Sequence, residues 1–106
     1  MVVLFWRAIA PTLGRYKYVD DIVKKREPHR AEHLALATKA KEDGIIVAGG
    51  ATTDPVGEAL IIFKAANKEE AADWAANFVS LDPYVQNDLV ESIEIKEWNV
   101  VVGGLD

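Results

Sequence analysis

Only a few side chains in this sequence of 106 residues could act as an acid, a base or a nucleophile, because it contains two histidines and no cysteine. The His33 imidazole could act as a base, since the unperturbed pKa of histidine is about 6.5. Asp82 could orient it, because a carboxylate that accepts one ring N–H raises the basicity of the other nitrogen. These two residues predict an acid–base site. On the alternative interpretation, His33 is a boundary residue that hydrogen-bonds the backbone.

Asp82 also has a purely structural interpretation. Asp followed by Pro commonly begins a short helix, with Asp as the N-cap and Pro at the first helical position, here over residues 83–87. Asp54 competes for the role of orienting residue, because it too precedes a proline and lies in a predicted loop. The spacing of these residues leaves the choice open.

Further candidate ligand contacts accompany the predicted pair. Arg30 lies three residues before the histidine, so on a helix it would reach the same neighbourhood and bind a carboxylate or phenolate, unless it only pairs with Glu27. Gly50 could let a ligand approach the backbone closely, or it could serve a strand end that needs unusual backbone angles. Together with Asp54 and Tyr84, Arg30 and Gly50 form the predicted substrate-binding set.

Neither a metal nor a cofactor is expected. His29 and His33 have the His-x-x-x-His spacing that places two imidazoles on one side of a helix, but no third ligand is evident. Gly49-Gly50 lacks the Lys-Ser/Thr ending and the following helix of a phosphate-binding loop. We therefore predict a cofactor-independent site without a metal.

The composition bounds the class of protein. A net charge of −5 and a pI near 5 argue against nucleic-acid binding, which needs a basic face. No apolar run approaches the roughly 20 residues that span a bilayer, and Arg7 interrupts the apolar run at residues 2–6 before a signal segment is complete. The chain is predicted to form one domain over residues 1–106. We expect a cytoplasmic protein whose partner is a small molecule.

The pattern of apolar residues predicts the element order β-α-β-β-α-β. The predicted strands cover residues 2–10, 45–48, 59–65 and 89–102, and the predicted helices cover residues 26–43 and 67–81. Residues 11–21 are predicted to form a loop long enough to cover a pocket. Such an order is typical of the ferredoxin-like α+β fold, a four-stranded antiparallel sheet with both helices on one face.

Two helix faces and a break in the last strand complete this prediction. The faces expected to be buried are Ala31, Leu34, Ala35 and Thr38 on the first helix, and Ala71, Trp74, Ala75 and Phe78 on the second. The alternation of the last strand reverses beyond Glu97, which indicates either a bulge near Lys96 and Glu97 or a tail that packs on a second subunit. We favour the tail. Because the strands are nearly all apolar, we also expect a homodimer packed sheet to sheet.

Six short motifs follow one another along the chain in a distinctive order. They are Arg30-Ala31-Glu32-His33-Leu34, Gly49-Gly50, Asp54-Pro55-Val56-Gly57, Lys68-Glu69-Glu70-Ala71, Asp82-Pro83-Tyr84-Val85 and residues 93–98. In this order they resemble the YCII-related domain family. The resemblance implies a ferredoxin-like fold of the dimeric α/β-barrel type and a His–Asp site on His33 and Asp82. The activity associated with the family is elimination of chloride from a chlorinated hydroxyhydroquinone.

Residues and resemblance together predict a cofactor-independent enzyme that acts on a small phenolic or carbonyl-bearing molecule by elimination or hydrolysis. His33 would act as general base or acid, Asp82 as its orienting residue, and Arg30 would stabilise anionic charge. The alternative, from a different class, is a non-catalytic dimeric module that binds a small ligand or a partner. In that case His33 and Asp82 only hold the pocket together.

Overall fold

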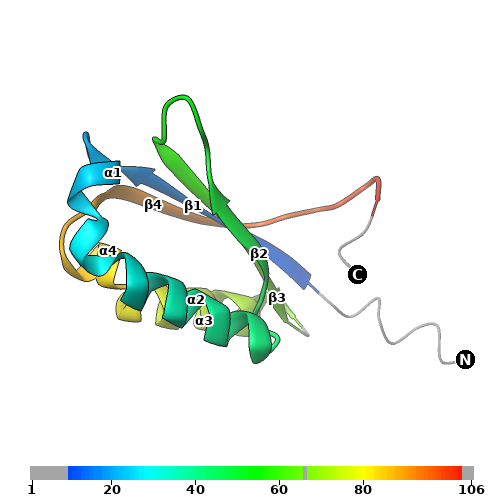
Figure 1. The fold of residues 1–106 in the computed structure, drawn as a ribbon. Coiled ribbons are helices and arrows are strands. Elements are labelled where there is room, and N and C mark those ends of the chain that lie inside the picture. The colour runs from blue at the N-terminus through cyan, green and yellow to red at the C-terminus, as the bar shows by residue number, and fades with distance from the viewer. Residues whose placement is uncertain (1–9, 66, 104–106) are drawn as a thin grey trace, which may run out of the picture.

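The computed structural model describes residues 10–65 and 67–103, which form one antiparallel sheet with the helices on one of its faces (Figure 1). The elements in chain order are β1 (Ala10–Tyr18), α1 (Ile22–Lys25), the 3-10 turn η2 (Glu27–His29), α2 (Arg30–Glu42), β2 (Ile46–Ala51), β3 (Glu58–Ala65), α3 (Lys68–Leu81), α4 (Pro83–Gln86) and β4 (Val90–Glu97). The strand order is β2-β3-β1-β4, and every neighbouring pair is antiparallel. This confirms the predicted ferredoxin-like sheet.

The first described strand lies where the sequence predicted a loop. β1 occupies most of residues 11–21, whereas the strand predicted over residues 2–10 lies outside the described residues apart from Ala10. Alternate residues of β1 are buried, namely Thr12, Gly14, Tyr16 and Tyr18, while Arg15 and Lys17 between them are exposed. This alternation is the signature of a strand with one covered face. The loop prediction was wrong because the exposed basic residues and Gly14 obscured the signal.

The helix that carries His33 buries a different face from the one predicted. The predicted face, Ala31, Leu34, Ala35 and Thr38, is exposed. The neighbouring stripe turns toward the sheet instead, with Ala40 buried and His33, Leu36 and Ala37 partly buried. α2 also begins later than predicted, at Arg30, because α1 and η2 take up the preceding residues. The rotation places the imidazole on the side of the sheet, where it can reach buried partners.

The hairpin and the second long helix agree with the sequence. β2 pairs with β3 as predicted, although β2 runs through Gly49 and Gly50 to Ala51 and does not end on the two glycines. Neither glycine has a positive φ, so the expectation of unusual backbone angles was wrong. The Asn67 side chain accepts a hydrogen bond from the Glu70 backbone N–H at 2.8 Å, which confirms the predicted cap of α3.

The last strand is shorter than predicted. β4 ends at Glu97, and its pairing with β1 is regular from Ser92 to Glu97, so the bulge considered near that end is absent from the described strands. An irregularity lies at the other end, between Lys17 and Tyr18 of β1. The backbone N–H of Trp98 still donates to the Pro11 carbonyl of β1 at 3.0 Å, and beyond Trp98 the chain leaves the sheet, close to the point where the alternation changes. Packing of this tail on a second subunit stays a prediction.

The helices and the sheet enclose the hydrophobic core. Phe63 of β3 is fully buried and packs edge-to-face against Phe78 of α3, with ring centroids 5.8 Å apart. Three residues of the predicted face of α3 are buried, namely Ala71, Ala75 and Phe78, while the fourth, Trp74, is partly buried. Among the described residues, no helix is both long and apolar enough to cross a membrane.

We expect Phe63→Ala to lower the free energy of unfolding by about 3–5 kcal/mol, because it removes a buried ring and leaves a cavity between β3 and α3. Leu81→Ala is a suitable control, since Leu81 is 51% exposed at the end of α3. It should cost less than about 1 kcal/mol. Urea denaturation followed by circular dichroism measures both. Equal losses would contradict the assigned core.

Candidate active site

The carboxylate of Asp82 is completely buried and accepts three hydrogen bonds. The Tyr16 hydroxyl donates to Oδ2 at 2.8 Å, and the Tyr84 backbone N–H donates to Oδ1 at 2.9 Å. Nδ1 of His33 lies 2.7 Å from the same Oδ1. Because an ionised carboxylate only accepts hydrogen bonds, Nδ1 is the donor. The structure therefore brings together the two residues that the sequence singled out.

Local structure accounts for the position of Asp82. The residue ends α3 and is the N-cap of α4, with Pro83 at the first helical position, so the predicted short helix is confirmed over Pro83–Gln86. Its Oδ1 accepts both the capping N–H of Tyr84 and the imidazole N–H of His33. The cap and the contact with the histidine were alternatives in the sequence, whereas in the structure one oxygen makes both contacts.

His33 is held between Asp82 and an aromatic ring. Its imidazole stacks on the Tyr84 ring, with centroids 3.8 Å apart and an interplanar angle of 6°. The side chain is 14% exposed, so it is covered but still reaches a cavity. No described residue hydrogen-bonds Nε2, which leaves this nitrogen able to accept a proton. The stack and the carboxylate together restrict the ring to one orientation.

Three tyrosines form a wall beside the histidine. Tyr18 packs edge-to-face on Tyr16 and on Tyr84, with ring centroids 6.3 and 6.1 Å apart. Burial raises the pKa of Tyr16, and it raises the pKa of Tyr18 to about 12. Their hydroxyls therefore remain protonated near neutral pH. Sequence reasoning missed Tyr16 and Tyr18 because they lay in the predicted loop, although their spacing of two was a signal.

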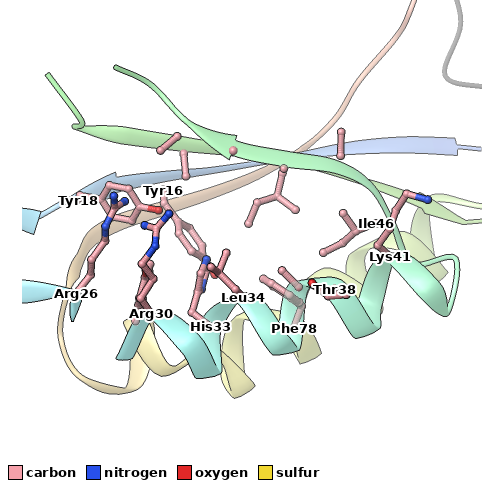
Figure 2. Close-up of a pocket in the computed structure, with 18 of the residues that line it drawn as sticks. Tyr16, Tyr18, Arg26, Arg30, His33, Leu34, Thr38, Lys41, Ile46 and Phe78 are labelled. Atoms are coloured by element: carbon pink, nitrogen blue, oxygen red, sulfur yellow. The ribbon is translucent and has the colours of Figure 1, made fainter. Parts of the chain in front are cut away.

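A cavity of about 510 Å³ lies between α2 and the sheet (Figure 2). His33 and Tyr84 line it, and the Arg26 and Arg30 side chains reach toward the sheet beside Tyr18. Arg30 was predicted as a ligand contact, whereas Arg26 was not recognised. No described carboxylate forms an ion pair with either arginine, so the predicted alternative of an Arg30–Glu27 pair is not observed.

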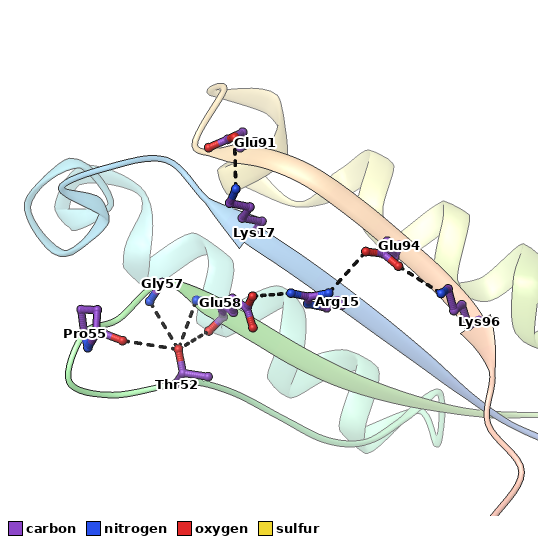
Figure 3. Close-up of polar contacts among 9 residues, drawn as sticks. All are labelled: Arg15, Lys17, Thr52, Pro55, Gly57, Glu58, Glu91, Glu94 and Lys96. Atoms are coloured by element: carbon purple, nitrogen blue, oxygen red, sulfur yellow. Dashed lines mark hydrogen bonds and ion pairs between the residues drawn. The ribbon is translucent and has the colours of Figure 1, made fainter.

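The two loop candidates differ in their placement. Gly50 lines the cavity, but a Cβ at this position would meet no atom within 4 Å, so the space there does not require glycine. Asp54 is exposed in the loop between β2 and β3 and does not line the cavity. Thr52 closes this loop, since its hydroxyl accepts hydrogen bonds from the backbone N–H groups of Gly57 and Glu58 at 3.3 and 3.2 Å (Figure 3). The structure thus brings Asp82, and not Asp54, to the histidine.

The second histidine takes no part in this arrangement. His29 ends η2, is partly buried and does not line the cavity. Within residues 10–65 and 67–103, no three His, Asp or Glu side chains are placed to hold a metal ion. The His-x-x-x-His spacing therefore does not correspond to a metal site within the described residues.

The chain is an α+β protein in which His33, hydrogen-bonded to the buried Asp82, lines a cavity between a helix and the sheet. The sequence model of the YCII-related domain matches residues 11–99, so the chain belongs to the YCII-related domain family. Among curated proteins no match is found.

Several solved structures are similar to this fold. The 5-chloro-2-hydroxyhydroquinone dehydrochlorinase from Burkholderia phenoliruptrix, in complex with 2,5-dihydroxybenzoquinone, is 22% identical, with a TM-score of 0.67 over 84% of this chain and 93% of that chain. A NIPSNAP family protein from Agrobacterium tumefaciens is 15% identical, with a TM-score of 0.60 over 86% and 91%. A monooxygenase-type protein for antibiotic biosynthesis from Bacteroides thetaiotaomicron is 11% identical, with a TM-score of 0.56 over 92% and 94%. At these identities the similarity shows a shared fold.

The raised pKa of Tyr18 predicts a loss of stability at high pH. The pKa of an unfolded tyrosine is about 10, so the native state holds this proton more tightly than the unfolded state does. The resulting stability is fully present below pH 10 and is lost as the pH rises from about 10 to 12. Over this range the free energy of unfolding should fall more steeply for the native sequence than for Tyr18→Phe. Parallel slopes in denaturant titrations would refute the assignment.

Proposed function

We propose that the protein is a cofactor-independent enzyme that uses His33 as a general base or acid on a small phenolic or carbonyl-bearing molecule. The reaction is an elimination or a hydrolysis. The observation that carries the proposal is the 2.7 Å contact between His33 Nδ1 and Asp82 Oδ1 beside the cavity. This contact leaves Nε2 as the ring nitrogen able to take a proton from a bound molecule.

Asp82 supports this role by electrostatics as well as by orientation. With Nδ1–H donated to the carboxylate, the imidazole is held in the tautomer whose lone pair is on Nε2. When Nε2 takes up a proton, the negative charge of Asp82 stabilises the imidazolium that forms. Tyr16 holds the other carboxylate oxygen, so Asp82 does not need to reorganise during proton transfer.

The two arginines of the cavity suit a reaction in which negative charge develops. In an elimination of HCl, Nε2 accepts the proton, the electron pair left behind forms the new π bond, and chloride leaves with the electrons of the C–Cl bond. Arg26 or Arg30 would stabilise a phenolate or the departing chloride. The similar dehydrochlorinase binds a planar dihydroxybenzoquinone, and this similarity supports a phenolic or quinonoid substrate for the present chain.

Substitution of His33 tests the proposal. With 5-chloro-2-hydroxyhydroquinone as the probe of elimination and a phenyl ester as the probe of hydrolysis, we expect His33→Gln to lower the rate by about 10²–10⁴-fold. Asp82→Asn should also lower the rate, because an amide cannot stabilise the imidazolium. His29→Gln is the matched control, since His29 lies one turn earlier and does not line the cavity. Chloride release and phenol release are the readouts.

The alternative, a non-catalytic binding module, makes the opposite prediction. On this alternative, the native protein binds these probes without converting either of them, and His33→Gln binds them with the same affinity. That result would support a binding module and contradict the proposed enzyme. In that case the buried pair would serve only to join α2 to α4.

We further propose that two copies pair through the sheet face that the helices leave uncovered. This face carries a mixture of apolar and charged side chains, among them the ion pairs of Arg15 with Glu58 and Glu94 (Figure 3). Leu60 is 43% exposed there, and Leu13 and Ile62, which are paired across β1 and β3, are partly exposed. Burial of this patch against a second copy would remove apolar surface from water.

Light scattering after size-exclusion chromatography tests the dimer. We expect a dimer for the native sequence and a monomer for Leu60→Lys, because the substitution would place an unpaired charge in the interface. Leu81→Lys is the control, since Leu81 is comparably exposed but lies on α3 in the helical layer. A monomeric native protein, or a dimer that survives Leu60→Lys and is lost in Leu81→Lys, would refute this interface.

A further inference from the structure

The walls of the cavity carry an excess of positive charge. Arg26, Arg30 and Lys41 line it, and none of the described lining residues is an aspartate or a glutamate. No described carboxylate pairs with these three cations, and Asp82 lies behind the histidine with its oxygens occupied. The whole chain, by contrast, has a net charge of −5. A cationic cavity in an acidic protein favours an anionic ligand.

One polar group at the same end of the cavity has no acceptor for its proton. The hydroxyl of Tyr84 is buried beside the Arg30 guanidinium, which can only donate, and no described group accepts the proton of the hydroxyl. Burial raises the pKa of Tyr84, although the charges of Arg26 and Arg30 oppose this shift, so the hydroxyl remains a proton donor near neutral pH. A buried donor without an acceptor is costly, and a ligand oxygen would satisfy it.

The rest of the cavity is apolar and long. Lys41 lies three turns after Arg30, about 16 Å along α2. Leu34 and Ala37 of α2 face Val47 and Ala48 of β2 across the space between these ends. The volume of about 510 Å³ is several times the roughly 150 Å³ of a cavity that holds benzene. One ring would leave much of this space unfilled.

Charge, the unpartnered donor and length together indicate the class of ligand. We infer that the cavity binds an elongated anion, whose carboxylate or equally charged group lies between Arg26, Arg30 and the Tyr84 hydroxyl, and whose apolar body extends along α2. Arginine forks suit a carboxylate because they present two parallel donors. Lys41 marks the far end, where it complements the C-terminal dipole of α2. The inference takes the carbonyl-bearing alternative of the proposed substrate class and adds to it an elongated apolar body. It rests on the proposed function for the location of the site.

Calorimetry with octanoate, benzoate and 1-octanol tests the inference on the full chain. We expect octanoate to bind at least about tenfold more tightly than 1-octanol, which lacks the charge, and than benzoate, which lacks the length. Equal affinity of 1-octanol and octanoate would overturn the anion-binding end. Equal affinity of benzoate and octanoate would overturn the elongated body.

Variants locate the two ends of the ligand. We expect the affinity for octanoate to fall roughly tenfold in each of three variants, Arg26→Gln, Arg30→Gln and Tyr84→Phe. Lys39→Gln, the same kind of change on α2 at a residue that does not line the cavity, should leave the affinity unchanged. Thr38 is an exposed lining residue two turns beyond Arg30. Thr38→Glu should lower the affinity for octanoate and leave the affinity for benzoate unchanged. Octanoate binding that resists all three substitutions at the charged end would overturn the site.

The histidine variant separates this inference from the proposed function. His33→Gln should keep most of the octanoate affinity, because the two arginines and Tyr84 remain. If His33→Gln binds octanoate but the native protein converts none of the catalytic probes, the proposed reaction fails and the ligand class stands. If the native protein is catalytic and octanoate does not bind, the ligand class fails and the reaction stands.

Discussion

Burial of the Asp82 carboxylate is possible only because donors from three separate elements converge on it. A carboxylate without partners in an apolar interior would be strongly destabilising. Tyr16 comes from β1, His33 from α2 and the Tyr84 N–H from α4, so the sheet, the long helix and the short helix must all be in place for the charge to be satisfied. The fold and the candidate site therefore depend on the same three hydrogen bonds.

Arginine side chains are paired with carboxylates on one face of the sheet and lack a described carboxylate partner on the other. On the uncovered face, Arg15 is paired with two glutamates and is largely neutralised. On the helical side, Arg26 and Arg30 line a cavity without a described carboxylate partner. Exposed ion pairs contribute little to stability, whereas unpaired cations beside an apolar cavity remain available to a ligand. This difference supports placing the chemistry on the helical side.

The sequence predicted much of this arrangement, and its errors have physical causes. The element order, the hairpin and the cap at Asn67 follow from local patterns and were confirmed. The motif order pointed to His33 and Asp82, which the structure brings within hydrogen-bonding distance, although their catalytic role stays a proposal. The loop predicted over residues 11–21 was wrong, because β1 alternates buried residues with the exposed basic residues Arg15 and Lys17 and therefore resembles a polar loop. Tyr16 and Tyr18 were missed with it.

By itself, the sequence determined which elements form, since caps, turns and apolar periodicity act over a few residues. It also limited the catalytic candidates to two histidines and the carboxylates near proline. Only the tertiary structure decided which stripe of α2 faces the sheet, because two adjacent stripes both contain residues compatible with burial. It likewise chose Asp82 over Asp54, since the selection depends on the distance to His33, which packing of α2 against α4 sets.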